Sequence, residues 1–204
     1  MSAQKTIGII IGSTRENRAG FQIANWLSRQ MTRNIKPEDN LKVEIVDLKD
    51  HPLTWYNEPH PPKALKPYVY PETIAWSKKI DSIDSFVFLT PTYNGSTSGA
   101  MKNAIDYLFK EWTTKPAFVV SYGGAGGSTS NSFLYTLLGG FIKMRLIDQN
   151  KTILISLKRE FYHPDTNQFK DIDTDLINYA QHVDVAFEEL KNLLNTPIET
   201  AASQ

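Results

Sequence analysis

The chain has 204 residues, of which 41% are hydrophobic, and its 22 Lys and Arg residues balance 22 Asp and Glu residues. This length suits one core, so we expect a single domain over residues 1–204, with its core at about 5–195 and a polar tail at 196–204. Zero net charge without basic runs argues against nucleic acid as a partner, and the absence of cysteine excludes disulfides and thiolate chemistry. Without a signal-peptide pattern or an apolar run of about 18 residues, we expect a cytoplasmic protein with no membrane partner.

The first half of the chain begins with a β-branched run at 6–11, the pattern of a strand buried on both faces. The turn-rich segment GSTRENRAG follows at 12–20, and apolar residues then recur at helical spacing over 23–31. A second strand is expected at 41–48, and its less continuous apolar pattern places it at a sheet edge. Residues 51–71 are rich in proline and aromatic residues, which indicates an irregular segment, either a substrate lid or an immobile surface wrap.

The second half continues the alternation of helix and strand. A short helix from about Glu72 precedes a strand at 85–90, which runs into the loop and helix of TPTYNGSTSGAMKNAID. A fourth strand, 116–121, leads into the loop YGGAGGSTSN, and a fifth strand is expected at 152–157. The helical apolar stripes of this half lie at 101–108, 133–141 and 176–194.

Five strands alternating with five helices predict an α/β layered sandwich, because parallel strands need crossover helices. The natural arrangement is a five-stranded parallel sheet in the order 2-1-3-4-5, with helices on both faces. Ligands of such sheets bind outside the carboxyl ends of the strands at the switch point. The loops after strands 1, 3 and 4 are the Gly-, Ser- and Asn-rich ones, so the predicted crevice coincides with these loops.

The first loop is suited to an anion, because it opens a helix whose first amide N–H groups are unpaired. Ser13 and Thr14 add hydroxyl donors, and Arg15 and Arg18 add positive charge. The loop lacks both the G-x-G-x-x-G pattern that receives a pyrophosphate and the Walker pattern, so a monophosphate is favoured. The alternative is an ordinary capped turn with two solvated arginines.

The third-strand loop carries no cysteine, histidine or carboxylate before Asp106, and so offers little for general acid/base chemistry. The third-strand loop presents backbone amides and the Asn94 side chain, although a turn followed by a helix cap at Ser98 has the same pattern. The glycines of the fourth-strand loop let backbone approach a ligand closely, or they form a flexible hinge. The four histidines show no metal-ligand spacing, so no metal site is expected.

Three motifs together resemble the NADPH-dependent FMN reductase family of flavodoxin-like folds, which includes NAD(P)H:quinone reductases and azoreductases. They are G-S-x-R in the first loop, P-x-Y-N-G…K-N-A-I-D from Pro91 to Asp106, and Y-G-G-x-G-G after the fourth strand. The resemblance spans about residues 5–157. It implies a flavodoxin-like three-layer sandwich, non-covalently bound FMN, and a homodimer with the flavin near the subunit interface.

The family's reaction is hydride transfer from NADPH or NADH to a small electron acceptor, namely a quinone, an azo dye or free flavin. FMN carries this chemistry, so no catalytic side chain is assigned. Carried onto this chain, the resemblance implies that Ser13, Arg15 and Arg18 hold the phosphate. It implies that the isoalloxazine ring is lined on one side by Pro91, Thr92, Tyr93, Asn94 and Gly95, and on the other by Tyr122, Gly123, Gly124 and Gly126.

Two other functions for a flavin-binding chain remain open. A flavodoxin-type electron carrier passes single electrons to protein partners, but carriers usually present an acidic docking face and the net charge here is zero. A regulatory protein whose FMN redox state controls association is the other alternative. We also expect Tyr107, Phe109 and Trp112, outside the inner helical stripe, to support dimerisation, although Trp112 would equally suit a place beneath the core.

Overall fold

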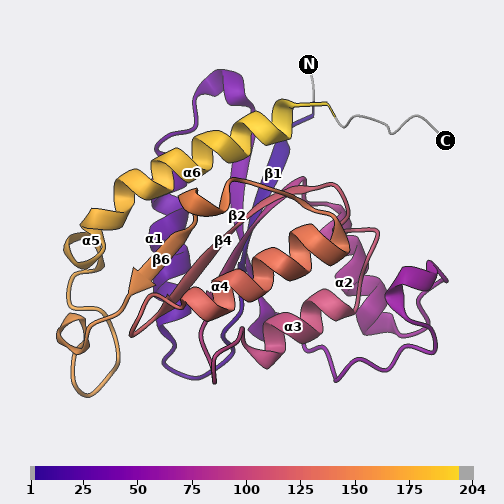
Figure 1. Cartoon of the computed structure of the whole chain (residues 1–204), viewed down its shortest axis with the longest axis horizontal. Coiled ribbons are helices and arrows are strands. Elements are labelled where there is room, and N and C mark those ends of the chain that lie inside the picture. Colours follow the sequence, from indigo (N-terminus) through magenta and orange to yellow (C-terminus); the bar gives the residue numbers. More distant parts are fainter. Residues whose placement is uncertain (1–2, 198–204) are drawn as a thin grey trace.

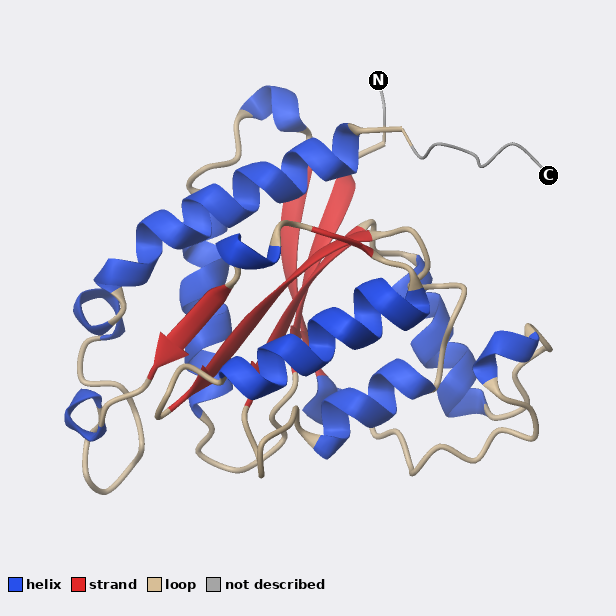
Figure 2. Cartoon of the chain, in the orientation of Figure 1, coloured by secondary structure: helices blue, strands red, loops and turns tan. Residues whose placement is uncertain are grey.

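The computed structural model describes residues 3–197 and contains a parallel sheet between two layers of helices (Figures 1 and 2). The strands are β1 (Lys5–Ile11), β2 (Leu41–Asp47), β3 (Ser85–Pro91), β4 (Pro116–Gly123), β5 (Arg145–Leu146) and β6 (Ile153–Ser156). The α-helices are α1 (Ala19–Thr32), α2 (Pro71–Asp81), α3 (Gly99–Asp106), α4 (Ser128–Tyr135), α5 (Ile172–Asp175) and α6 (Ile177–Asn195). The expected polar tail falls mainly on 198–204, outside the described residues.

The strand order is β2-β1-β3-β4-β5, all neighbours are parallel, and β2 lies at the expected edge. This confirms the predicted fold. The far edge is divided between two short strands, because β5 pairs with the beginning of β4 and β6 pairs with its end. The fifth strand expected at 152–157 is β6, whereas the two-residue β5 is too short to show a periodic pattern.

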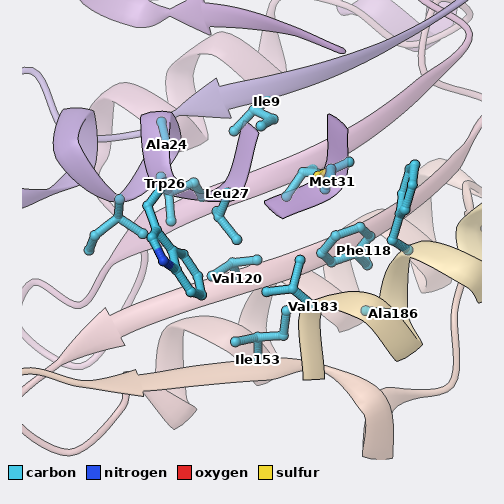
Figure 3. Packing of buried hydrophobic residues seen from close by; sticks show 14 of the residues in the cluster. Ile9, Ala24, Trp26, Leu27, Met31, Phe118, Val120, Ile153, Val183 and Ala186 are labelled. Atoms are coloured by element: carbon cyan, nitrogen blue, oxygen red, sulfur yellow. The ribbon is translucent and has the colours of Figure 1, made fainter. Parts of the chain in front are cut away.

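The two faces of the sheet support separate hydrophobic clusters, because successive strand residues point to opposite sides. Ile7, Ile9 and Ile11 of β1 face α1 and α6, whereas Ile10 packs in the cluster formed with α2 and α3. Figure 3 shows part of the α1/α6 cluster, with Trp26 of α1 close to the residues of β4 and α6. Among residues 3–197, no helix is both long and apolar enough to cross a bilayer.

The helix that follows the third-strand loop is shorter than its apolar stripe predicts, since α3 ends at Asp106. Tyr107 and Trp112 lie beyond it and are fully buried within the subunit. The Trp112 ring has its centroid 5.0 Å from that of Phe86 and 5.7 Å from that of Phe88. Trp112 is therefore a core residue, and neither it nor Tyr107 supports the expected dimer surface.

The helix expected at 133–141 also differs, because α4 ends at Tyr135 and a π-helix, Thr136–Ile142, continues from it. Helices α2 and α1 follow the predicted ranges closely. The final predicted stripe, 176–194, corresponds to α6, and the short helix α5 precedes it.

The proline-rich segment 51–71 is attached to the body of the protein by side-chain hydrogen bonds. The Tyr56 amide donates to Asn103 Oδ1 over 3.0 Å, and the Tyr68 hydroxyl lies 3.0 Å from a carboxylate oxygen of the buried Glu111. Glu58 accepts from the backbone amides of Val69 and Tyr70 over 3.0 and 3.2 Å. These contacts at both ends of the segment favour its interpretation as a surface wrap.

Candidate functional site

The carboxyl ends of β1, β3 and β4 bring the three predicted loops to one edge of the sheet. Ile11 is paired with Leu89, and Pro91 is paired with Tyr122. The Gly12 amide extends the first pairing by donating to the Leu89 carbonyl over 2.8 Å. The loop after β3 therefore starts about one strand spacing, roughly 5 Å, from each of the loops after β1 and β4.

The first loop and the third-strand loop are joined through Tyr93. Its hydroxyl lies 2.8 Å from the hydroxyl of Ser13, which is only 1% exposed, and it accepts a hydrogen bond of 2.9 Å from Arg15 Nε. The Arg15 guanidinium lies over the Tyr93 ring, 5.8 Å from the centroid. Three of the predicted site residues thus form one cluster, in which Arg15 remains exposed at the surface.

Arg18 has a different environment from Arg15. It forms an ion pair with Asp47 at the end of β2, and the two side chains are only 10% and 9% exposed. Its Nε atom is buried and has no hydrogen-bond partner among residues 3–197. A direct contact between Arg18 and a phosphate stays a prediction, and it would have to use donors that the Asp47 contact leaves free.

The third-strand loop is a tight turn that exposes its tip. The amides and carbonyls of Tyr93 and Ser96 pair over 2.9 and 3.1 Å, and Asn94 and Gly95 between them have φ values of +49° and +79°. Asn-Gly suits such a two-residue turn because both central residues need positive φ. Ser98 then caps α3, because its Oγ accepts from the Met101 amide over 3.1 Å, and it also donates to the Gly12 carbonyl.

The fourth-strand loop approaches Thr92 through Gly127, a glycine that the sequence reasoning did not assign to the site. Gly127 has φ +73°, and a Cβ there would lie 2.6 Å from Thr92 Oγ1, so a side chain at this position is excluded. The Thr92 hydroxyl is also 2.7 Å from that of Ser130 in α4. These contacts fix the spacing between two of the loops.

A cavity of about 300 Å³ opens between the three loops. It contains part of the predicted set, whereas Ser13, Arg18, Asn94, Gly95, Gly124 and Gly126 are not among its lining residues. The predicted residues that line it are Arg15, Pro91, Thr92, Tyr93, Tyr122 and Gly123. The lining also includes Asn17, Ala19, Leu157, Tyr162 and Asn167, which the sequence reasoning missed.

The outer wall of this cavity comes from the segment after β6. Gln22 of α1 fixes this segment by donating to the Asn167 carbonyl over 3.3 Å and by accepting from the Phe169 amide over 2.8 Å. Burial, with a further effect of Asp175, raises the pKa of Tyr162 to about 12, so this hydroxyl is protonated at neutral pH. The predicted topology could have indicated the lining residues that follow β6, because β6 also ends at the edge of the sheet where ligands bind.

A larger cavity, of about 490 Å³, lies between α3 and the segment that follows β2. Of the first loop it includes only Thr14. Two of its polar side chains are already engaged, since Lys49 forms an ion pair of 2.6 Å with Glu16, and the Asn103 amide bonds to the backbone of Thr54 and Tyr56. We therefore take the smaller cavity, with its convergent donors, as the candidate site.

Comparison with known proteins shows the family to which the chain belongs. The family of NADPH-dependent FMN reductases matches residues 6–155. An NAD(P)H-dependent FMN reductase of Schizosaccharomyces pombe is 42% identical over 139 residues, which cover 68% of this chain and 67% of that protein. One of Saccharomyces cerevisiae is 40% identical over 147 residues, covering 69% and 76%, and a quinone reductase of Pseudomonas putida is 35% identical over 141 residues, covering 64% and 68%.

The fold agrees with that of solved flavoenzymes. The NAD(P)H:(acceptor) oxidoreductase FerB of Paracoccus denitrificans has a TM-score of 0.67 at 22% identity, over 92% of this chain and 98% of that one. The chain thus has a flavodoxin-like fold. The chain is a member of the NADPH-dependent FMN reductase family. This membership confirms the enzyme class and the FMN cofactor that the sequence predicts.

The residues at the cavity fit FMN on two physical grounds. Arg15 and the buried Tyr122 hydroxyl, which has no hydrogen-bond partner among residues 3–197, supply donors at the helix end where a phosphate is favoured. In the loops that border the cavity, although not in its lining, Gly95 and Gly124 expose bare backbone, since a Cβ on either would have no neighbour within 4 Å, and a flat ring can approach such backbone.

Proposed function

We propose that this protein transfers a hydride from NADPH or NADH to a quinone, an azo compound or free flavin, with FMN bound at the loops after β1, β3 and β4. The observation that carries the proposal is the convergence of Arg15, Tyr93 and Tyr122 in one cavity beside the beginning of α1. FMN, when bound, supplies the hydride chemistry, and the protein binds and orients the reactants.

We propose the following roles for the protein's residues. Ser13 and Arg15 hold the phosphate, and Arg18 offers it the guanidinium donors that the ion pair with Asp47 leaves free. Backbone and side-chain groups of Pro91, Thr92, Tyr93, Asn94 and Gly95 line one side of the ring, and Tyr122, Gly123, Gly124 and Gly126 line the other. The exposed Asn94-Gly95 turn offers amide donors and acceptors to the polar edge of the ring.

We propose further that the nucleotide and the acceptor use the same space in turn, because each must stack on the one accessible flavin face. Turnover then follows a ping-pong scheme. Initial rates with varied NADPH and a fixed series of quinone concentrations should give parallel double-reciprocal lines. Intersecting lines would show that both substrates are bound at once and would contradict the shared site.

The assembly and location of the protein are part of the same proposal. We expect a cytoplasmic homodimer, with small-molecule acceptors rather than nucleic acid or membranes as partners. An electron carrier and a redox-controlled regulatory protein are the competing functions. Rapid turnover of quinone with either nucleotide supports the enzyme over both.

A further inference from the structure

Tyr122 extends beneath the beginning of α1, toward the cluster formed by the α1 and α6 layer of the core. Its hydroxyl oxygen lies 2.5 Å from the position that a Cβ on Gly20 would take, so a side chain at residue 20 would have to displace the hydroxyl. The Tyr122 residue is 5% exposed, so this hydroxyl is held inside the protein, directly under the first turn of the helix.

Although it is buried and close to the Ser13 hydroxyl, this hydroxyl forms no hydrogen bond of good geometry with a described residue. An unsatisfied buried hydroxyl is unusual because it has lost its hydrogen bonds to water without replacement. Burial, with an added effect of Tyr93, raises the pKa of Tyr122, against smaller opposing effects of Ser13 and Arg15. The group is therefore a protonated donor near two residues of the first loop.

The helix end above it also has unsatisfied groups. Arg18 at the N-cap makes no side-chain capping bond, and the first turn of α1 contains no acidic residue. The first amide N–H groups of a helix have no partner within the helix, and the helix dipole favours an anion there. Tyr122, Ala19 and Arg15 line the same cavity, so the uncapped helix end and the unpartnered hydroxyl meet at one place.

We propose that the Tyr122 hydroxyl donates a hydrogen bond to a phosphate oxygen of the cofactor and is a residue by which the protein distinguishes FMN from unphosphorylated flavin. The inference rests on the proposed function. It gives Tyr122 a role at the phosphate end through its side chain, whereas the family resemblance placed this residue only beside the ring. Gly20 is then required because it leaves room for the hydroxyl.

The test is Tyr122→Phe, which removes the hydroxyl and keeps the ring. Titration of the apo-protein with FMN and with riboflavin, followed by flavin fluorescence, should show FMN binding weakened by about 10-fold or more and riboflavin binding almost unchanged. The melting temperature of the apo-variant should be unchanged or higher, because the substitution removes a buried group that had no partner. If the Tyr122 hydroxyl only stabilised the fold, Tyr122→Phe would instead lower the melting temperature and weaken the binding of both flavins equally.

Tyr135→Phe is the matched control, because the Tyr135 hydroxyl is half-buried and donates to the Ile147 carbonyl over 3.3 Å, and Tyr135 does not line the cavity. It should leave the ratio of FMN to riboflavin affinity unchanged. Gly20→Ala is the second variant. In the wild-type background, Gly20→Ala should weaken the binding of FMN more than the binding of riboflavin, because the new methyl group displaces the Tyr122 hydroxyl. In the Tyr122→Phe background it should have little further effect on either affinity.

The possible failures are distinguishable. If the wild-type protein binds neither flavin, the proposed function fails, and this inference fails with it. If the wild type prefers FMN and Tyr122→Phe retains the same preference, the function stands and the phosphate contact is overturned.

Discussion

Arg15 is the charged residue at the candidate site that combines exposure with a contact to a second loop. If it pairs with the phosphate, Arg15→Ala should cost about 1.5–3 kcal/mol of FMN binding, on the order of 10- to 100-fold in dissociation constant. Riboflavin binding should be almost unaffected, because riboflavin has no phosphate. Fluorescence titration of wild type and variant with both flavins measures the difference, and equal losses would place the phosphate on another residue.

A matched control for this substitution is Arg29→Ala. Arg29 lies at the far end of α1 and forms an exposed ion pair of 2.9 Å with Asp173. It carries the same charge as Arg15 but is remote from the cavity lining. The variant should bind both flavins as the wild type does, which separates a direct contact from a general loss of positive charge.

At the residue scale, sequence reasoning located the loops better than it located side chains within them. Arg15 and Arg18 look alike in the loop GSTRENRAG, and only the fold reveals that Arg18 meets Asp47 at the end of β2. The side-chain direction of Tyr122 was open to prediction, since Tyr122 is two residues from Val120 and so shares a strand face with it. Tyr162 belongs to a polar loop without a local pattern, and its place depends on the Gln22 contacts.

The segment 51–71 provides a prediction at the scale of an element. Burial acts to raise the pKa of Glu58, but the neighbouring Thr73 side chain and the hydrogen bonds from the Val69 and Tyr70 amides lower it below the ordinary value of 4.5. A lowered folded-state pKa means that ionised Glu58 stabilises the fold above its unfolded pKa. That stabilisation is lost as the pH falls through the folded-state value.

Glu58→Gln should therefore lower the free energy of unfolding near neutral pH by about 1 kcal/mol or less, because the site is partly solvated. The difference from wild type should shrink as the pH falls from about 6 to about 3. Urea unfolding at a series of pH values measures it. Glu160→Gln, which removes an exposed carboxylate 3.6 Å from Lys158, is the control, and a difference that stays constant with pH would refute the role of Glu58.

Helices and strands with a strong hydrophobic period could be predicted from the sequence, but the residues at which they end were harder to predict. The apolar runs of β1 and β3 are buried on both faces, which explains their continuous pattern. The stripe that continues past Asp106 misled the prediction of α3, because Tyr107 and Leu108 are buried by the turn that follows the helix. A periodic pattern of apolar residues indicates that the residues are buried, and a turn beneath the core can be buried as fully as a helix.

At the scale of the whole molecule, we predict a homodimer. The grounds are the family resemblance and the large apolar side chains exposed on segment 51–71, with Trp55 at 79%, Leu65 at 62% and Val69 at 58% exposure. Light scattering at micromolar concentration should give twice the chain mass of 23.1 kDa. A mass of 23.1 kDa would contradict the dimer.

The strand order and the position of the crevice could be derived from the alternation of strands and helices, because few topologies satisfy the rules for parallel sheets. The division of the far sheet edge into β5 and β6 could not, because the two-residue β5 is defined by its pairing with β4 rather than by its own sequence. The outer wall of the cavity could not be derived from the sequence either, because its residues lie beyond the region that the family model matches.

The central claim is that this protein takes a hydride from NAD(P)H by means of FMN bound at the loops after β1, β3 and β4. The most direct measurement is the visible spectrum of the FMN-loaded protein before and after anaerobic addition of NADPH or NADH, with free FMN as the control. We predict that the absorbance of the bound flavin is lost within seconds, while free FMN under the same conditions is unchanged. A bound flavin that stays oxidised with both nucleotides but is reduced by dithionite would contradict the claim and favour an electron carrier.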